Sequence, residues 1–192
     1  KRFSIVKEEM QIDLDEFDLS YYTYGMSIYK NMPLIEPLET KEVKKIYEFV
    51  IVLDTSYSID ENLAKRFISN TYSILSTSNM FYKSCKVHII QCDDRIRKDD
   101  VISNQNEMDR LLNSFSLIGG GNTDFRPVFS YVNDLINQKV FQNLCGLLYF
   151  TDGKGIYPKK SPAYKTAFIY LEDYDQSKVP SWAIQYRLEE KL

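Results

Sequence analysis

The amino-acid sequence predicts an α/β protein with a central, mostly parallel sheet and helices on both of its faces. From Ile46 onward, short apolar runs alternate with segments whose apolar residues recur at helical intervals, and this alternation is typical of βαβ units. Polar residues with side-chain oxygens follow several of these runs directly, at the strand ends where open α/β sheets place their ligands. A length of 192 residues, of which 44% are hydrophobic and 27% charged, suits one well-buried core of an ordinary globular protein.

The individual elements follow from residue types and spacings. Ser58 and Glu61 form a capping box at the start of the first predicted helix, and Pro127 suits the first turn of the third. The charge cluster at residues 93–100 is typical of a protected sheet edge. The predicted strands are residues 47–53, 85–92, a short edge strand around Ile96, 145–150, 166–171 and a final strand within 182–188. The predicted helices are residues 58–76, 105–115 and 126–137, and residues 153–165 are expected to form a loop.

Residues 1–45 differ in composition from the rest of the chain. They hold clustered acids and tyrosines followed by Pro33 and Pro37, and the prolines oppose a continuous helix or central strand. We therefore expect an N-terminal arm or linker at 1–45 and the domain at 46–192. The chain begins at Lys1 rather than Met, so the arm is expected to join a missing upstream region. A dedicated recognition surface is the alternative.

Five side chains with oxygen atoms are candidates for a cation site. Asp54, Ser56 and Ser58 alternate along the turn after the first strand, and a carboxylate with two hydroxyls suits a small hard cation that keeps several waters. Thr123 lies in a glycine-rich loop, and Asp152 directly follows a strand. Asp or Ser after a strand also occurs as a helix N-cap without metal, but capping does not explain why all five positions occur in this order.

These residues resemble the metal-ion-dependent adhesion site (MIDAS) of von Willebrand factor A (VWA) domains, with D-x-S-x-S after the first strand, a loop Thr and a later Asp. The resemblance is closest to the C-terminal VWA-like domain of bacterial predicted metallopeptidase-like proteins, which carry a G-G-G-T-D-F-R-P-V-F block. Residues 119–129 match that block with one extra Asn. The likeness runs from about Asp15 to the C-terminus, and it implies a Rossmann-like VWA fold.

The resemblance also implies a cofactor, a partner and roles for the five residues. Mg²⁺ or Mn²⁺ would be held by Asp54, Ser56, Ser58 and Thr123, with Asp152 reached through water, and an acidic side chain of a protein partner would fill the open position. Related bacterial proteins are linked with AAA-type ATPases of the MoxR class, which makes such an ATPase the implied partner.

Three alternatives remain at the level of sequence. Tyr57 stands where related domains have Gly, which favours a degenerate scaffold that binds no metal. A metallopeptidase would need a zinc-binding segment absent here, because the chain has one histidine, His88, and no His-Glu-x-x-His. A phosphatase using Asp54 as nucleophile lacks a second Asp at Ser56. We therefore expect no catalytic residues, and no enzyme activity from this chain alone.

Charge and composition exclude several kinds of partner. A net charge of −3 gives no general attraction for nucleic acid or anionic membranes, and the apolar runs are far shorter than the roughly 20 residues of a membrane span. The glycine loop lacks the Gly-Lys-Ser/Thr ending of a phosphate-binding loop. Cys85, Cys92 and Cys145 are interpreted as buried free thiols in a reducing cytoplasm.

Overall fold

The computed structural model describes residues 5–30, 32–56, 60–77, 81–171 and 173–188. The chain divides into two compact units, one holding residues 3–45 and the other residues 46–192.

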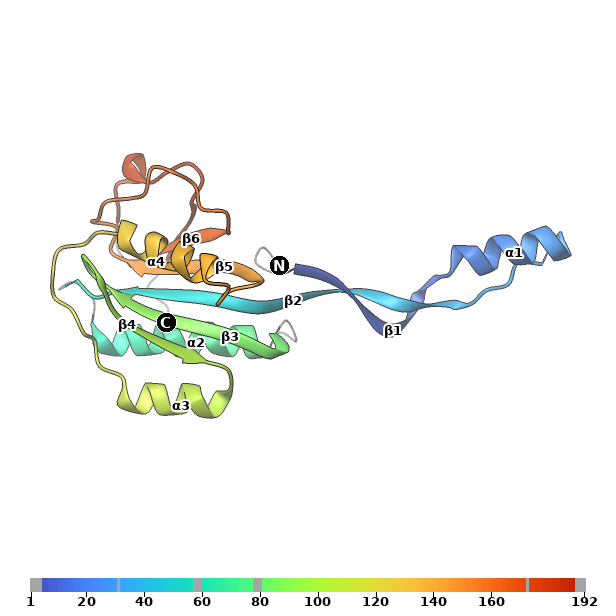
Figure 1. The fold of residues 1–192 in the computed structure, drawn as a ribbon, viewed down its shortest axis with the longest axis horizontal. Coiled ribbons are helices and arrows are strands. Elements are labelled where there is room, and N and C mark those ends of the chain that lie inside the picture. Colours follow the sequence, from blue (N-terminus) through green and yellow to red (C-terminus); the bar gives the residue numbers. More distant parts are fainter. Residues whose placement is uncertain (1–4, 31, 57–59, 78–80, 172, 189–192) are drawn as a thin grey trace. The chain divides into compact units, whose positions relative to one another are not determined.

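The N-terminal unit is a two-stranded ribbon with a helix between its strands (Figure 1). Strand β1 (Ile5–Phe17) pairs antiparallel with the first part of β2 (Pro37–Asp54), and helix α1 (Leu19–Tyr29) connects them. The first strand of the sheet, predicted to begin at residue 47, therefore begins ten residues earlier. Pro37 is compatible with this because it takes the first position of β2, where no ladder donor is lost inside the strand.

The C-terminal unit contains the predicted mostly parallel sheet. Its order is β4-β3-β2-β5-β6-β7, and β4, the predicted edge strand, is the one strand in this order that runs antiparallel to its neighbour. The strands after β2 are β3 (Phe81–Cys92), β4 (Ile96–Ile102), β5 (Leu144–Thr151), β6 (Thr166–Tyr170) and β7 (Ile184–Arg187), with a short 3-10 helix, η1 (Gln176–Lys178), before β7.

Helices cover both faces of this sheet, as predicted. Helices α2 (Glu61–Thr77) and α3 (Gln105–Ser114) lie on one side and α4 (Arg126–Asn137) on the other (Figure 1). The predicted capping residue Ser58 lies outside the described residues. The carboxylate of Asp60 accepts the N–H groups of Asn62 and Leu63 at 3.1 and 3.2 Å, so Asp60 caps α2.

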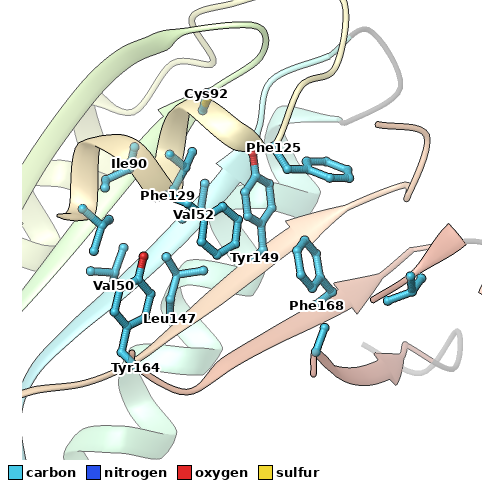
Figure 2. Packing of buried hydrophobic residues seen from close by; sticks show 14 of the residues in the cluster. Val50, Val52, Ile90, Cys92, Phe125, Phe129, Leu147, Tyr149, Tyr164 and Phe168 are labelled. Atoms are coloured by element: carbon cyan, nitrogen blue, oxygen red, sulfur yellow. The ribbon is translucent and has the colours of Figure 1, made fainter. Parts of the chain in front are cut away.

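Alternating side chains of β2 build the core on both faces of the sheet. Val50 and Val52 pack with Leu147, Tyr149 and α4 residues in one cluster (Figure 2). On the other face, Phe67 of α2 stacks on Phe150 of β5 with ring centroids 4.1 Å apart. A strand buried on both faces has little freedom to shift, because a slip of one residue would exchange its two faces. The position of the residues at its end is thereby fixed.

The three cysteines are free and buried, as predicted, and burial raises the pKa of Cys85 and of Cys92 to about 12. His88 is also buried, with Nδ1 3.0 Å from a carboxylate oxygen of Asp99, which accepts a hydrogen bond from Tyr131 of α4. None of the described helices is long and apolar enough to cross a membrane.

Candidate functional site

The candidate site lies where β2, β3 and β5 end side by side. Asp54, the last residue of β2, is opposite Cys92 of β3, and Leu53 is opposite Phe150 of β5. The carboxylate of Asp54 is fully buried. It accepts the backbone N–H of Ser56 at 2.9 Å and the hydroxyl of Thr151 at 2.6 Å. Thr151 therefore ties the end of β5 to the end of β2.

Asp152 supplies a second carboxylate at this edge. It is 4% exposed, its Oδ1 accepts the N–H of Lys154 at 3.0 Å, and its Oδ2 lies 3.5 Å from the Lys154 ammonium. Burial raises the pKa of Asp54, and the negative charge of Asp152 raises it further, while hydrogen bonds from Thr151 and Ser56 act in the opposite direction. The two carboxylates are thus close enough to repel one another, and a bound cation would relieve that repulsion.

The glycine loop that carries Thr123 is held to the same edge by its backbone. Gly120 N–H donates to the carbonyl of Thr55 at 2.9 Å, Asp124 N–H to the carbonyl of Asp93 at 3.0 Å, and Phe125 N–H to the carbonyl of Ile156 at 3.1 Å. These carbonyls follow β2, β3 and β5 respectively. The loop is therefore anchored on both sides of Thr123 by the segments that carry the candidate ligands.

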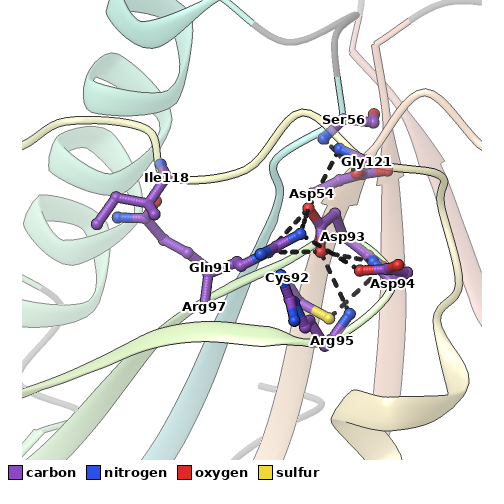
Figure 3. Close-up of polar contacts among 10 residues, drawn as sticks. All are labelled: Asp54, Ser56, Gln91, Cys92, Asp93, Asp94, Arg95, Arg97, Ile118 and Gly121. Atoms are coloured by element: carbon purple, nitrogen blue, oxygen red, sulfur yellow. Dashed lines mark hydrogen bonds and ion pairs between the residues drawn. The ribbon is translucent and has the colours of Figure 1, made fainter.

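A buried ion pair beneath the glycine loop was missed by the sequence analysis. Figure 3 shows the Arg97 guanidinium on the fully buried carboxylate of Asp93, with N···O distances of 2.7 to 2.9 Å. Asp93 also accepts the N–H groups of Asp94, Arg95 and Gly121. Burial alone would raise the pKa of Asp93, but the hydrogen bonds from Arg97, Asp94 and Arg95 hold it well below its ordinary value.

Two further polar contacts shape the loop. Buried Gln91 of β3 accepts the N–H of Ile118 at 2.8 Å and donates to the carbonyl of Ser116 at 3.1 Å, which fixes the entry to the loop. At its exit, Arg126 pairs with Asp124 through two nitrogens, the shortest contact being 2.7 Å. The planar guanidinium suits this pairing through two nitrogens.

Four of the five predicted ligand residues thus belong to one edge of the sheet. Asp54 accepts hydrogen bonds from Ser56 and from Thr151, the residue before Asp152, and Thr123 lies in the loop anchored to the same strand ends. Ser58 and the neighbouring Tyr57 lie outside the described residues. The described part of the chain holds no cluster of three or more His, Cys, Asp or Glu side chains suited to a metal. A set of two carboxylates and hydroxyls fits Mg²⁺ or Mn²⁺, which prefer oxygen ligands and keep waters.

A comparison with protein-family models decides the family. The model described as a VWA-like domain (DUF2201) matches residues 49–189. The chain belongs to this family. The predicted VWA-like fold is therefore confirmed, and the matched residues include each of the candidate ligands.

Solved structures agree with the VWA-like fold. A von Willebrand factor type A protein from Catenulispora acidiphila has a TM-score of 0.52 at 9% identity, covering 79% of this chain and 40% of that one. Proximal thread matrix protein 1 from the mussel byssus has a TM-score of 0.51 at 10% identity, covering 73% of this chain and 43% of that one. The ArnB paralog VWA2 from Sulfolobus acidocaldarius has a TM-score of 0.50 at 14% identity, covering 97% of this chain and 51% of that one. The chain thus spans about half or less of these proteins, which at such identities share its fold alone. A search of curated proteins found no match.

Replacing Gly155 with alanine is expected to displace Thr123. An added Cβ would lie 2.7 Å from Thr123 Cγ2 and 2.6 Å from the ring of Phe125, which is fully buried. Overpacking of this kind costs about 1–3 kcal/mol, so thermal unfolding should show a lower Tm. Ser161→Ala, an exposed change in the same loop, is the control. An unchanged Tm for Gly155→Ala would contradict close packing between this loop and Thr123.

Proposed function

We propose that this VWA-like domain binds a protein partner through a divalent cation. Mg²⁺ or Mn²⁺ is held by Asp54, Ser56, Ser58 and Thr123, with Asp152 joined through water, and a partner's carboxylate completes the coordination. The observation that carries the proposal is the buried Asp54 carboxylate beside Asp152. Hydrogen bonds reach Asp54, but among the described residues no cationic side chain pairs with it.

The residues around Asp54 have separate tasks in this proposal. The Thr151 hydroxyl orients the carboxylate of Asp54, and the anchored glycine loop sets the position of Thr123. When bound, the cation supplies positive charge to a partner carboxylate, and it keeps much of that charge because the chain offers two carboxylates. Binding of this kind does not require a nucleophile or a general acid, and hydrolysis is not part of the proposal.

An acidic protein surface is the partner that suits the neighbourhood of the site. The loop after β5 carries Lys154, Lys159 and Lys160, all exposed, and positive charges near a binding site raise the association rate of a negatively charged partner. Resemblance to bacterial metallopeptidase-like proteins adds an AAA-type ATPase of the MoxR class as the candidate partner. The three free, buried cysteines suit the cytoplasm as the compartment.

A scaffold without metal is the second candidate, and two contacts favour it. The ammonium of Lys154 lies 3.5 Å from Asp152 and offsets part of its charge, and each oxygen of Asp54 already accepts a hydrogen bond. In this alternative the same edge of the sheet binds a partner through Lys154 and the loop backbone. The two candidates differ in their response to divalent cations.

Mg²⁺ and Mn²⁺ should raise the Tm of the wild type. A ligand that binds the native state at ten times its Kd adds about 1.4 kcal/mol, which for a domain of this size raises Tm by roughly 3–6 °C. We expect this shift after removal of metal with EDTA and addition of either cation, and we expect a smaller one in Thr123→Ala. Ser161→Ala should respond as the wild type does. If saturating Mg²⁺ or Mn²⁺ does not change the thermal unfolding curve of the wild type, the metal-dependent proposal is wrong and the scaffold without metal is favoured.

A further inference from the structure

The N-terminal unit exposes an unusually apolar surface. More than half of the exposed large hydrophobic side chains in the described part of the chain lie between residues 17 and 35. Helix α1 itself contains no charged residue. Its exposed members include Leu19 at 67%, Tyr24 at 59% and Ile28 at 49%. Exposed apolar patches of this kind mark interaction sites in soluble proteins.

The helix is held in place with most of its apolar side chains facing solvent. Gly25 is its one buried residue, and a Cβ there would lie 2.4 Å from the backbone nitrogen of Leu34. The chain after α1 thus approaches the helix closely at Gly25, the one residue of α1 without a side chain. At the other end, Asp18 caps α1 by accepting the N–H of Ser20 at 2.7 Å. The helix is therefore positioned by its backbone and its cap, and most of its large side chains are exposed.

An acidic cavity adjoins the first turn of α1. Its volume is about 270 Å³, and it is lined by Asp18, Tyr21, Glu36, Pro37, Leu38 and Glu39. This is below the roughly 300–1,000 Å³ of small-molecule sites, which suits one long side chain better than a cofactor. Three carboxylates attract a cationic group, and the ring of Tyr21 offers a face on which such a group can rest.

We propose that α1 and this cavity together bind a protein segment in which a lysine or arginine is flanked by apolar residues. The apolar residues cover the exposed side chains of α1, and the cationic head enters the cavity. Charge complementarity selects this occupant. A second copy of the chain would bring the same acids against each other, and an anionic lipid surface would be repelled by them. The proposed metal site takes an acidic partner, so the two surfaces recognise opposite chemistries and are independent.

Fluorescence anisotropy with a labelled helical peptide of leucine and arginine tests this proposal. With the full chain in EDTA, which keeps the metal site out of the measurement, we expect binding to the wild type. Tyr24→Ser/Ile28→Ser and Glu36→Gln/Glu39→Gln should each weaken binding about tenfold or more, since each pair removes central contacts. The matched controls are Ile74→Ser, a 70% exposed apolar residue on α2, and Asp134→Asn, an exposed acid on α4. Neither control should change the affinity.

The other occupants give distinct results. The same peptide with glutamate in place of arginine should not bind, and binding of both peptides alike would overturn the proposal. So would equal affinity of all four variants for the arginine peptide. Self-association of the wild type that Tyr24→Ser/Ile28→Ser abolishes would assign α1 to a second copy. Flotation with phosphatidylcholine vesicles, lost in the same variant, would assign it to lipid. Circular dichroism of each variant checks that the fold is retained.

Discussion

Replacing Arg97 with methionine should lower the free energy of unfolding by about 3–5 kcal/mol at neutral pH, the usual cost of removing one partner from a buried ion pair. Asp93 is fully buried, and the Arg97 side chain is 22% exposed and contacts it through two nitrogens. Without the guanidinium, the negative charge of Asp93 stays buried, and only backbone N–H groups donate hydrogen bonds to it. Methionine keeps the length and apolar stem of the side chain, so the loss reports on charge more than on packing.

The pH dependence of this effect has a defined sign. The folded-state pKa of Asp93 lies below its ordinary value of 3.8, so its contribution to stability is present above that value and is lost as the pH falls through the folded pKa. In Arg97→Met, protonation of Asp93 would instead relieve the buried charge. The difference in Tm between wild type and variant should therefore be largest near neutral pH and should shrink in acid.

Two variants control the Arg97 experiment. Arg95→Met removes an exposed guanidinium two residues away and should change Tm little. Asp93→Asn combined with Arg97→Met removes both charges, so the double variant should be more stable than Arg97→Met alone. Equal losses for Arg95→Met and Arg97→Met would show that the pair does not stabilise the fold.

The sequence predicted the sheet because its signals are local. Apolar runs and helical intervals are visible within ten or fifteen residues, and Pro127 marks the start of α4 at the predicted position. The N-terminal ribbon could not be predicted in this way. Helix α1 has no charged residues, so it lacks the contrast between an apolar and a charged side that predicts a helix, and β1 depends on a partner strand twenty to forty residues away.

The candidate site also combines residues that local sequence signals predict with residues whose contacts come from distant parts of the chain. Asp54 and Asp152 were predicted because each directly follows an apolar strand. Thr151 was missed, since threonine at a strand end is common for its β propensity alone, and its hydrogen bond joins residues 97 positions apart. Asp93 carried a signal that could have been used. It directly follows the predicted strand 85–92 as Asp54 directly follows the predicted strand 47–53, and Arg97 comes four residues later, but the charge cluster was attributed to the sheet edge alone.

Asp54→Asn should make the metal-free domain more stable and should abolish its response to Mg²⁺ and Mn²⁺. Burial, with the charge of Asp152, places the folded-state pKa of Asp54 above its ordinary value of 3.8. Its contribution to stability is therefore fully present below that value and is lost as the pH rises through the folded pKa. At neutral pH the ionised carboxylate costs free energy. Asparagine removes the charge at nearly the same size, and the Thr151 hydroxyl can rotate to accept the amide N–H.

Thermal unfolding with EDTA, Mg²⁺ or Mn²⁺ separates the two parts of this prediction. In EDTA, Asp54→Asn should melt above the wild type, by about 2–4 °C for each kcal/mol of relief. The difference should fade as the pH falls through the folded-state pKa of Asp54 and should be lost below its ordinary value of 3.8. With either cation, the wild-type Tm should rise while that of the variant stays, because a neutral amide is a much weaker ligand for a hard cation than a carboxylate. Asp134→Asn, an exposed change on α4, should match the wild type throughout. A lower Tm for Asp54→Asn in EDTA would mean that hydrogen bonding at Asp54 outweighs its desolvation. An equal cation response in both proteins would remove Asp54 from the metal site.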